Sequence, residues 1–149
     1  MERNSAETLP YFLIDTNIFL ELLLNQEKAA DVIKFFSLIE KGVYVGFYTI
    51  FTLHSLLIIL TTQKKWKSLL NFLTYLASYP TFQLLTASSP SEEKQIVKIC
   101  KTQLLDFDDA TQYYFTKKIN AALVSFDKHF DKTDLKRKKP KEILEKLIR

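Results

Sequence analysis

Four aspartates in three separate segments are the residues of this sequence best suited to chemistry. Asp15 ends the run Tyr-Phe-Leu-Ile-Asp, Asp108 and Asp109 form a pair in the second half, and Asp127 follows Leu-Val-Ser-Phe. Each segment lies where an apolar, strand-like run ends or where a helical pattern begins. Because ligands of open α/β sheets collect at the carboxyl ends of parallel strands, we expect these carboxylates to meet in one cleft.

A cluster of carboxylates repels itself unless a cation neutralises it. Carboxylate oxygens suit hard divalent ions such as Mg²⁺ and Mn²⁺, which activate a water and neutralise phosphate oxygens during phosphodiester displacement. Asp106, Asp108 and Asp109 strengthen this interpretation, because the start of a helix needs only one capping residue. For Asp15 alone, a plain helix cap is the competing interpretation. A metal-dependent nuclease is therefore the first hypothesis.

The elements that must position these acids alternate between strands and helices. Apolar runs predict four strands, at Leu9–Ile14, Val43–Phe47, Phe82–Leu85 and Ala121–Phe126. Helical spacing and capping signals predict a helix after Asp15 and further helices at Glu27–Lys41, Thr49–Leu60, Lys64–Tyr79, Ser88 to about Gln103, Ala110–Ile119 and Lys141–Ile148. This alternation predicts an α/β fold with a parallel sheet covered on both sides.

Size and composition indicate one domain over residues 1–149. With 149 residues, 47% of them hydrophobic, the chain has enough apolar surface for one continuous core, on which residues 132–149 are expected to pack. Twelve Phe and seven Tyr residues against two Gly predict a core rich in large rings, which we expect to include Trp66. No glycine-rich phosphate loop is present, so P-loop and dinucleotide-binding motifs are excluded.

The compartment expected from the sequence is the cytoplasm. Cys100 is the single cysteine and cannot form an internal disulfide, which fits a reducing interior. The first residues do not resemble a secretory signal, and the longest apolar stretches are too short to span a bilayer, so no membrane association is expected.

A basic run lies just past the Asp127 segment. It reads Lys-Thr-Asp-Leu-Lys-Arg-Lys-Lys-Pro-Lys from Lys132 to Lys141, in a chain with a net charge of +4. Such a run would suit a phosphate backbone, but a solvated linker before the last helix is an equally acceptable interpretation.

Three blocks of this sequence resemble signature segments of the PIN domain family, and they occur in the order of that family. The blocks are Leu-Ile-Asp15-Thr-Asn-Ile-Phe-Leu-Glu, Asp106-Phe-Asp-Asp109-Ala-Thr-Gln-Tyr and Leu-Val-Ser-Phe-Asp127-Lys-His-Phe. The resemblance covers the chain from residue 11 to about residue 144. It implies a three-layer α/β/α sandwich with a central parallel sheet and a metal-dependent endoribonuclease activity on single-stranded RNA, as in VapC-type toxins of toxin–antitoxin modules.

The resemblance also implies roles for individual residues. Asp15, Asp109 and Asp127 match the acids that bind Mg²⁺ or Mn²⁺ and carry catalysis in the family. Asn17 and Ser125 match polar positions that orient the acids or the attacking water. An antitoxin protein as partner and a homodimer are further expectations that rest on the family alone.

One departure from the family pattern affects the expected activity. PIN nucleases usually carry a Glu on the helix after the second strand, whereas this chain has Phe-Thr-Leu-His54-Ser55 there, with Ser55 at the position of the Glu. A His or a hydroxyl here, such as that of Ser55, could still hold a metal-bound water or position a phosphate oxygen of the substrate. Weaker metal binding, an altered base preference and loss of activity are therefore the alternative outcomes of this change. The alternative function is therefore a catalytically weak module of the same fold that binds RNA or a protein. For His54 a partly buried structural histidine is the competing interpretation, and no role is expected for His129.

Overall fold

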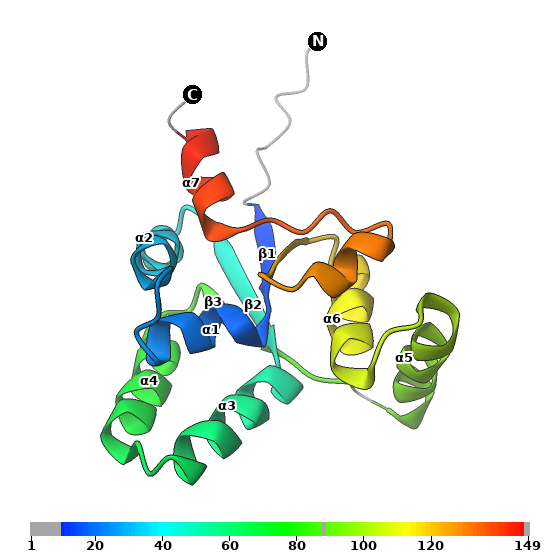
Figure 1. Ribbon diagram of the computed structural model, residues 1–149, viewed down its shortest axis with the longest axis horizontal. Coiled ribbons are helices and arrows are strands. Elements are labelled where there is room, and N and C mark those ends of the chain that lie inside the picture. Colours follow the sequence, from blue (N-terminus) through cyan, green and yellow to red (C-terminus); the bar gives the residue numbers. More distant parts are fainter. Residues whose placement is uncertain (1–9, 88, 148–149) are drawn as a thin grey trace.

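Four parallel strands form the sheet that carries the acidic residues (Figure 1). The computed structural model describes residues 10–87 and 89–147. The strands are β1 (Tyr11–Ile14), β2 (Val45–Thr49), β3 (Phe82–Leu85) and β4 (Ala122–Val124). Their order in the sheet is β3-β2-β1-β4, so the two strands that lead to Asp15 and Asp127 are neighbours. The predicted parallel sheet is confirmed.

Helices cover both faces of this sheet. They are α1 (Thr16–Leu23), α2 (Ala29–Glu40), α3 (Ile50–Thr62), α4 (Trp66–Ser78), α5 (Pro90–Gln103), α6 (Phe107–Lys118), the short 3-10 helix η1 (Lys128–Lys132) and α7 (Pro140–Leu147). In Figure 1, α5 and α6 lie on one side of the strands, and α2, α4 and α7 lie on the other. The predicted three-layer α/β/α arrangement is confirmed.

Alternating side chains of β1 divide the core into two clusters. Phe12 and Ile14 pack with residues of α1, α2 and α4, whereas Leu13 packs with residues of α5 and α6. Because both faces are covered, the strand reads as a continuous apolar run, which is why its position was predictable. The adjacent β2 passes so close that a Cβ on Gly46 would lie 2.8 Å from the Cδ1 atoms of both Ile14 and Ile39.

Each acidic segment lies at the start of a helix and caps it. The Asp15 carboxylate accepts a hydrogen bond from the backbone N–H of Thr16 (2.8 Å) at the start of α1. Asp106 accepts from the N–H of Asp109 (2.9 Å) at the start of α6, and Asp127 accepts from the N–H of His129 (2.8 Å) at the start of η1. Since α6 begins at residue 107, Asp108 and Asp109 are in its first turn and need not act as caps.

The basic run is anchored along the edge of the sheet. The N–H of Lys138 donates to the carbonyl oxygen of Leu123 (2.7 Å), and the N–H of Ser125 donates to the carbonyl oxygen of Lys138 (3.0 Å), so this segment runs beside β4. Arg137 is paired with Asp131, with 2.8 Å between Nε and Oδ1. The segment is therefore tied to the sheet at residue 138, and the expectation of a solvated linker is wrong there.

Two side chains lie elsewhere than the sequence suggested. Trp66 was expected in the core but is 55% exposed, because it belongs to the first turn of α4, and the helix reaches the core only through its later residues Leu69, Phe72 and Leu76. His54 was considered as a partly buried residue but is exposed on α3. Among the described residues, no helix is both long and apolar enough to cross a membrane.

Candidate metal centre

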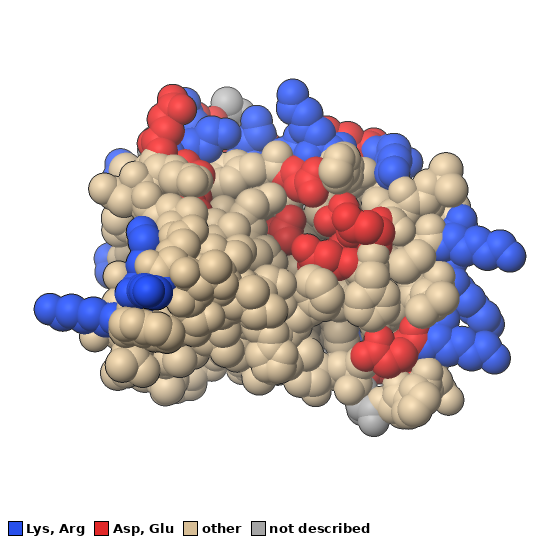
Figure 2. All heavy atoms as spheres, turned by 60° about the horizontal axis from the view of Figure 1, so that its bottom comes forward, with Lys and Arg blue, Asp and Glu red and all other residues tan. Residues whose placement is uncertain are grey.

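Carboxylates from three segments come together at the carboxyl edge of the sheet. Asp15 follows β1, Asp127 lies beyond the end of the neighbouring β4, and Asp109 is in the first turn of α6, which packs against β1. Figure 2 shows acidic side chains around a hollow on a face that is otherwise mostly uncharged, with lysines and arginines at its margins. Asp15 and Asp109 are only 3% and 5% exposed.

Burial and mutual repulsion raise the pKa values of these carboxyl groups. Burial, with a smaller effect of the charges of Asp109 and Asp127, raises the pKa of Asp15 to about 6, although hydrogen bonds from Ser125 and Thr16 oppose this shift. Burial also raises the pKa of Asp109, and the nearby Asp106 and Asp127 charges act in the same direction. The metal-free cluster therefore disfavours full ionisation, as expected of a site that a cation would complete.

Asp108 belongs to the same cluster. Burial, together with the charges of Asp15, Asp109 and Asp106, raises its pKa to about 7. Its Oδ1 atom is buried without a hydrogen-bond partner among the residues that the structure describes. Asp108 was not among the predicted metal ligands, yet it adds a carboxylate to the group.

A network of hydrogen bonds surrounds the carboxylate of Asp15. The Ser125 hydroxyl donates to Asp15 Oδ2 (2.6 Å), and Asn17 Nδ2 lies 3.4 Å from the same oxygen and 3.3 Å from Ser125 Oγ. The backbone N–H groups of Phe126 and Asp127 donate to Asn17 Oδ1 (3.2 Å) and Ser125 Oγ (2.9 Å). The structure thus brings Asn17 and Ser125 to the acids, and their role in orienting them remains a prediction.

Two further polar side chains, Gln112 and Thr52, lie on the Oδ1 side of the Asp15 carboxylate, opposite Ser125. Neither was predicted from the sequence to belong to the site. Gln112 of α6 is wholly buried, and its Nε2 donates to Thr52 Oγ1 (2.8 Å) and, over a longer distance, to Asp15 Oδ1 (3.3 Å). Thr52 of α3 also shares a hydrogen bond with the hydroxyl of Thr16 (2.9 Å). Gln112 lies one helical turn after Asp109, and this spacing was the only sequence signal for it.

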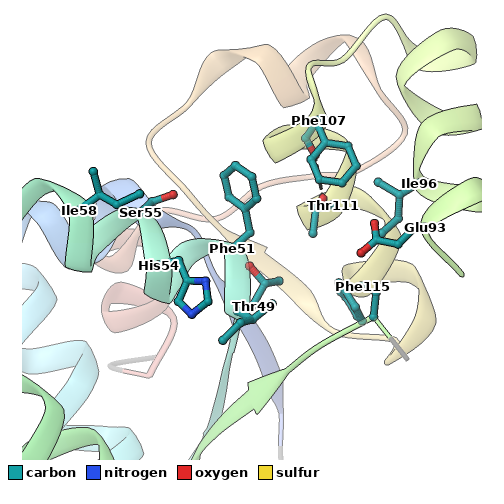
Figure 3. Close-up of a pocket in the computed structure, with 12 residues that line it drawn as sticks. Thr49, Phe51, His54, Ser55, Ile58, Glu93, Ile96, Phe107, Thr111 and Phe115 are labelled. Carbon is teal, nitrogen blue, oxygen red and sulfur yellow. Dashed lines mark hydrogen bonds between the residues drawn. The ribbon is translucent and has the colours of Figure 1, made fainter. Parts of the chain in front are cut away.

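Ser55 is not part of this network. Within the part of the chain that the structure describes, its side chain makes no hydrogen bond, and it lines an apolar groove between α3 and α6 together with His54. Figure 3 shows Phe51 pointing across this groove toward Phe107, and the two ring centroids are 5.9 Å apart. The groove lies next to the acidic cluster, because Phe107 directly precedes Asp108.

The donor set fits a divalent cation. Asp109, Asp127 and His129 each offer one ligand atom, and these three atoms lie within 4.8 Å of one another. Asp15 is not in this group of three but interacts electrostatically with Asp109 and Asp127. Besides Asp108 Oδ1, the buried Gln112 Oε1 has no hydrogen-bond partner among the described residues. Several carboxylates and two unpartnered buried acceptors are what a cation or its bound waters would satisfy.

Comparisons with known proteins agree with this geometry. The sequence matches the PIN domain family over residues 12–136. No curated protein sequence matches this chain. Among solved structures, a toxin–antitoxin complex from Klebsiella pneumoniae shares 16% identity at a TM-score of 0.58, over 79% of this chain and 88% of the other.

Two further solved structures show the same fold. A protein from Pyrobaculum aerophilum shares 17% identity at a TM-score of 0.65, over 93% of this chain and 97% of the other. FitAcB from Neisseria gonorrhoeae shares 21% identity at a TM-score of 0.63, over 87% of this chain and 97% of the other. The family match over most of the chain, the parallel α/β/α sandwich and the acidic cluster at its carboxyl edge together show that this chain belongs to the PIN domain family.

Proposed function

We propose that this protein is a metal-dependent endoribonuclease that cleaves single-stranded RNA, and that it is the toxin of a toxin–antitoxin pair. The observation that carries the proposal is the gathering of Asp15, Asp108, Asp109 and Asp127 at one edge of the sheet, two of them almost fully buried. Buried carboxylates with raised pKa values destabilise a fold at neutral pH, so their grouping calls for a role outside folding.

Asp15, Asp109 and Asp127 would hold Mg²⁺ or Mn²⁺ in this cleft. When bound, such an ion supplies a water of lowered pKa and neutralises charge on the phosphate oxygens. The chain contributes the orientation of the acids: Ser125 holds one oxygen of Asp15, and Thr16 holds the other. A carboxylate held on both oxygens keeps its position without a metal, which lowers the cost of organising the site.

The anchored basic segment supports RNA as the substrate. Lys136 is exposed and Lys139 is half-buried, on either side of Lys138, whose backbone is bonded beside β4. Asp127 lies beyond the end of the same strand, so this segment runs beside the strand that leads to Asp127. Single-stranded RNA would extend its phosphates toward these lysines while one phosphodiester reaches the acids.

Similarity of fold to the toxin–antitoxin complex from Klebsiella pneumoniae supports the proposed biological setting. A small antitoxin would place a segment in the acidic cleft and block access to it. The homodimer expected from the family remains a prediction.

A second function is favoured by one observation. Ser55 takes the place of the usual family Glu and lies in an apolar groove, so this chain lacks one carboxylate of the expected set. A PIN-fold module that binds RNA or a protein without cutting it would tolerate this loss.

Parallel measurements of RNA binding and cleavage distinguish the two functions. Under the nuclease proposal, Asp109→Asn abolishes cleavage of an end-labelled single-stranded RNA in Mn²⁺ while the affinity for that RNA stays within about threefold. Under the binding alternative, the wild-type protein binds the same RNA and leaves it intact in Mn²⁺, Mg²⁺ and EDTA alike. That result would overturn the nuclease proposal.

A further inference from the structure

His129 occupies a position between two of the acids that sequence reasoning passed over. Its Nδ1 lies 3.2 Å from Asp127 Oδ1 and 3.4 Å from Asp109 Oδ2. The backbone N–H of His129 donates to Asp127 Oδ1 (2.8 Å), and the next residue, Phe130, is wholly buried. The 3-10 helix η1 therefore holds the backbone of His129 beside the acids, although the side chain is 69% exposed.

These distances match the separations of ligands around one metal ion. Two adjacent ligands at about 2.1 Å from an octahedral metal are about 3.0 Å apart. Two ligands at about 2.05 Å from a tetrahedral metal are about 3.3 Å apart. The contact of His129 Nδ1 with Asp127 (3.2 Å) falls in this range, the contact with Asp109 (3.4 Å) lies just above it, and all three ligand atoms lie within 4.8 Å of one another.

A second observation is an unpartnered buried acceptor beside Asp15, in the same group of carboxylates. Gln112 is wholly buried, its Nε2 is directed at Thr52 and Asp15, and its Oε1 has no hydrogen-bond partner in the described part of the chain. A buried amide oxygen without a partner beside a group of carboxylates is satisfied by a bound ion or by water that such an ion holds.

We propose that His129 is a ligand of the metal ion together with Asp109 and Asp127. This inference rests on the metal site of the proposed function. An imidazole ligand suits Mn²⁺, Co²⁺ and Zn²⁺ better than Mg²⁺, which prefers oxygen. The site of this chain therefore selects a transition metal over Mg²⁺, in contrast to a site made of carboxylates alone.

The alternative to a ligand role is that the His129 side chain acts as a cation between Asp109 and Asp127. In that role the imidazole would have to move away from the two carboxylates before a metal ion could bind. The two roles predict opposite effects of removing the imidazole. Loss of a ligand weakens metal binding, whereas loss of a competing cation strengthens it for every divalent ion.

Calorimetric titration of the metal-free full chain with Mn²⁺, Zn²⁺ and Mg²⁺ separates these roles. For His129→Ala we expect the affinities for Mn²⁺ and Zn²⁺ to fall by at least about tenfold and the affinity for Mg²⁺ to change by less than about threefold. The matched control is His54→Ala, which removes the other histidine of the chain from an exposed position and should leave all three affinities unchanged.

Imidazole NMR signals give a second readout, because the chain has only two histidines. Addition of Zn²⁺ should shift the ring signals of His129 and leave those of His54 in place. Equal or tighter Mn²⁺ and Zn²⁺ binding by His129→Ala would overturn the proposal.

Asp109→Asn separates failure of this inference from failure of the proposed function. If Asp109→Asn abolishes metal binding while His129→Ala does not change it, only the ligand role of His129 is wrong. If the wild-type chain binds none of the three ions, both the metal site and the role of His129 are overturned.

Discussion

Replacing Asp15 by Asn should make the metal-free protein more stable at pH 8. Asp15 is 3% exposed, and its pKa is raised from 3.8 to about 6, chiefly by burial. A group whose pKa is higher in the folded state binds protons more tightly there, so ionising it at high pH costs stability. The neutral side chain of Asn removes that cost.

The size of the gain follows from the pKa shift and the hydrogen bonds. One pKa unit corresponds to about 1.4 kcal/mol, so a shift from 3.8 to about 6 corresponds to about 3 kcal/mol above pH 6. An Asn amide facing Ser125 Oγ replaces an accepting oxygen by a donor, and the lost hydrogen bond costs about 1 kcal/mol. The net gain at pH 8 is therefore about 1–2 kcal/mol.

The stability difference between Asp15→Asn and the wild type should depend on pH, and the direction of that dependence tests the reasoning. As the pH falls from 8 through 6 toward 4, the Asp15 carboxyl of the wild type takes up its proton, and the stability advantage of Asp15→Asn disappears. Urea unfolding in EDTA at pH 8, 6.5, 5 and 4, followed by circular dichroism, measures the difference. The matched control is Asp131→Asn, because the pKa of Asp131 is lowered by Arg137, and its neutralisation should bring no gain.

Two outcomes would refute this reasoning. The first is an Asp15→Asn protein that is less stable than the wild type at pH 8. The second is a stability difference that stays constant between pH 8 and pH 4.

Three further predictions concern packing, the hydrogen-bond network and RNA binding. Gly46→Ala should lower the free energy of unfolding by about 1–3 kcal/mol in urea titrations, because its Cβ would lie 2.8 Å from two core side chains; Gly42→Ala, which meets open space at a φ of +77°, should cost only about 1 kcal/mol. Thr52→Val should lower kcat about tenfold at unchanged KM in steady-state RNA cleavage. The change removes the hydroxyl that accepts a hydrogen bond from Gln112, whose side-chain amide also donates to the Asp15 carboxylate. Replacing Lys136 and Lys139 by Ala should weaken single-stranded RNA binding and reduce the slope of log affinity against log salt by about 1.4 for the pair.

Each of these predictions has a contradicting result. Equal losses of stability for Gly46→Ala and Gly42→Ala would show that the structure around residue 46 rearranges to accommodate a Cβ atom. A raised KM with unchanged kcat for Thr52→Val would assign that hydroxyl to substrate binding. An unchanged salt slope for the double lysine variant would place the RNA away from the anchored basic segment.

The strands and the acidic edge were predictable because local patterns determine them. Phe82–Leu85 was predicted with the bounds that the structure has, and β1 lies within the predicted run because both of its faces are buried. Asp15 and Asp127 follow neighbouring parallel strands, so their convergence follows from the fold class once the strands are known. Element boundaries differed where a polar residue ended the strand, as at Thr49, which closes β2 and caps α3.

Residues joined only by tertiary packing were not predictable in the same way. Gln112 and Asp15 are 97 positions apart, and a glutamine on a helix of mixed polarity reads as a solvent-facing residue. His129 lies beside Asp109 because η1 turns back toward α6, and no periodicity in the sequence indicates that turn. Trp66 was misplaced because helical spacing does not reveal that the first turn of α4 is exposed.

We propose that the acidic cluster holds a metal ion at which the protein cleaves RNA. The most direct test is the rate of cleavage of a fluorescent single-stranded RNA by the purified chain in Mn²⁺, Mg²⁺ or EDTA, with Asp15→Asn measured beside it. We predict cleavage by the wild type that requires the metal, and loss of that cleavage in the stably folded Asp15→Asn protein. Intact RNA across varied sequences with folded, antitoxin-free wild type, or equal cleavage by Asp15→Asn, would contradict the claim.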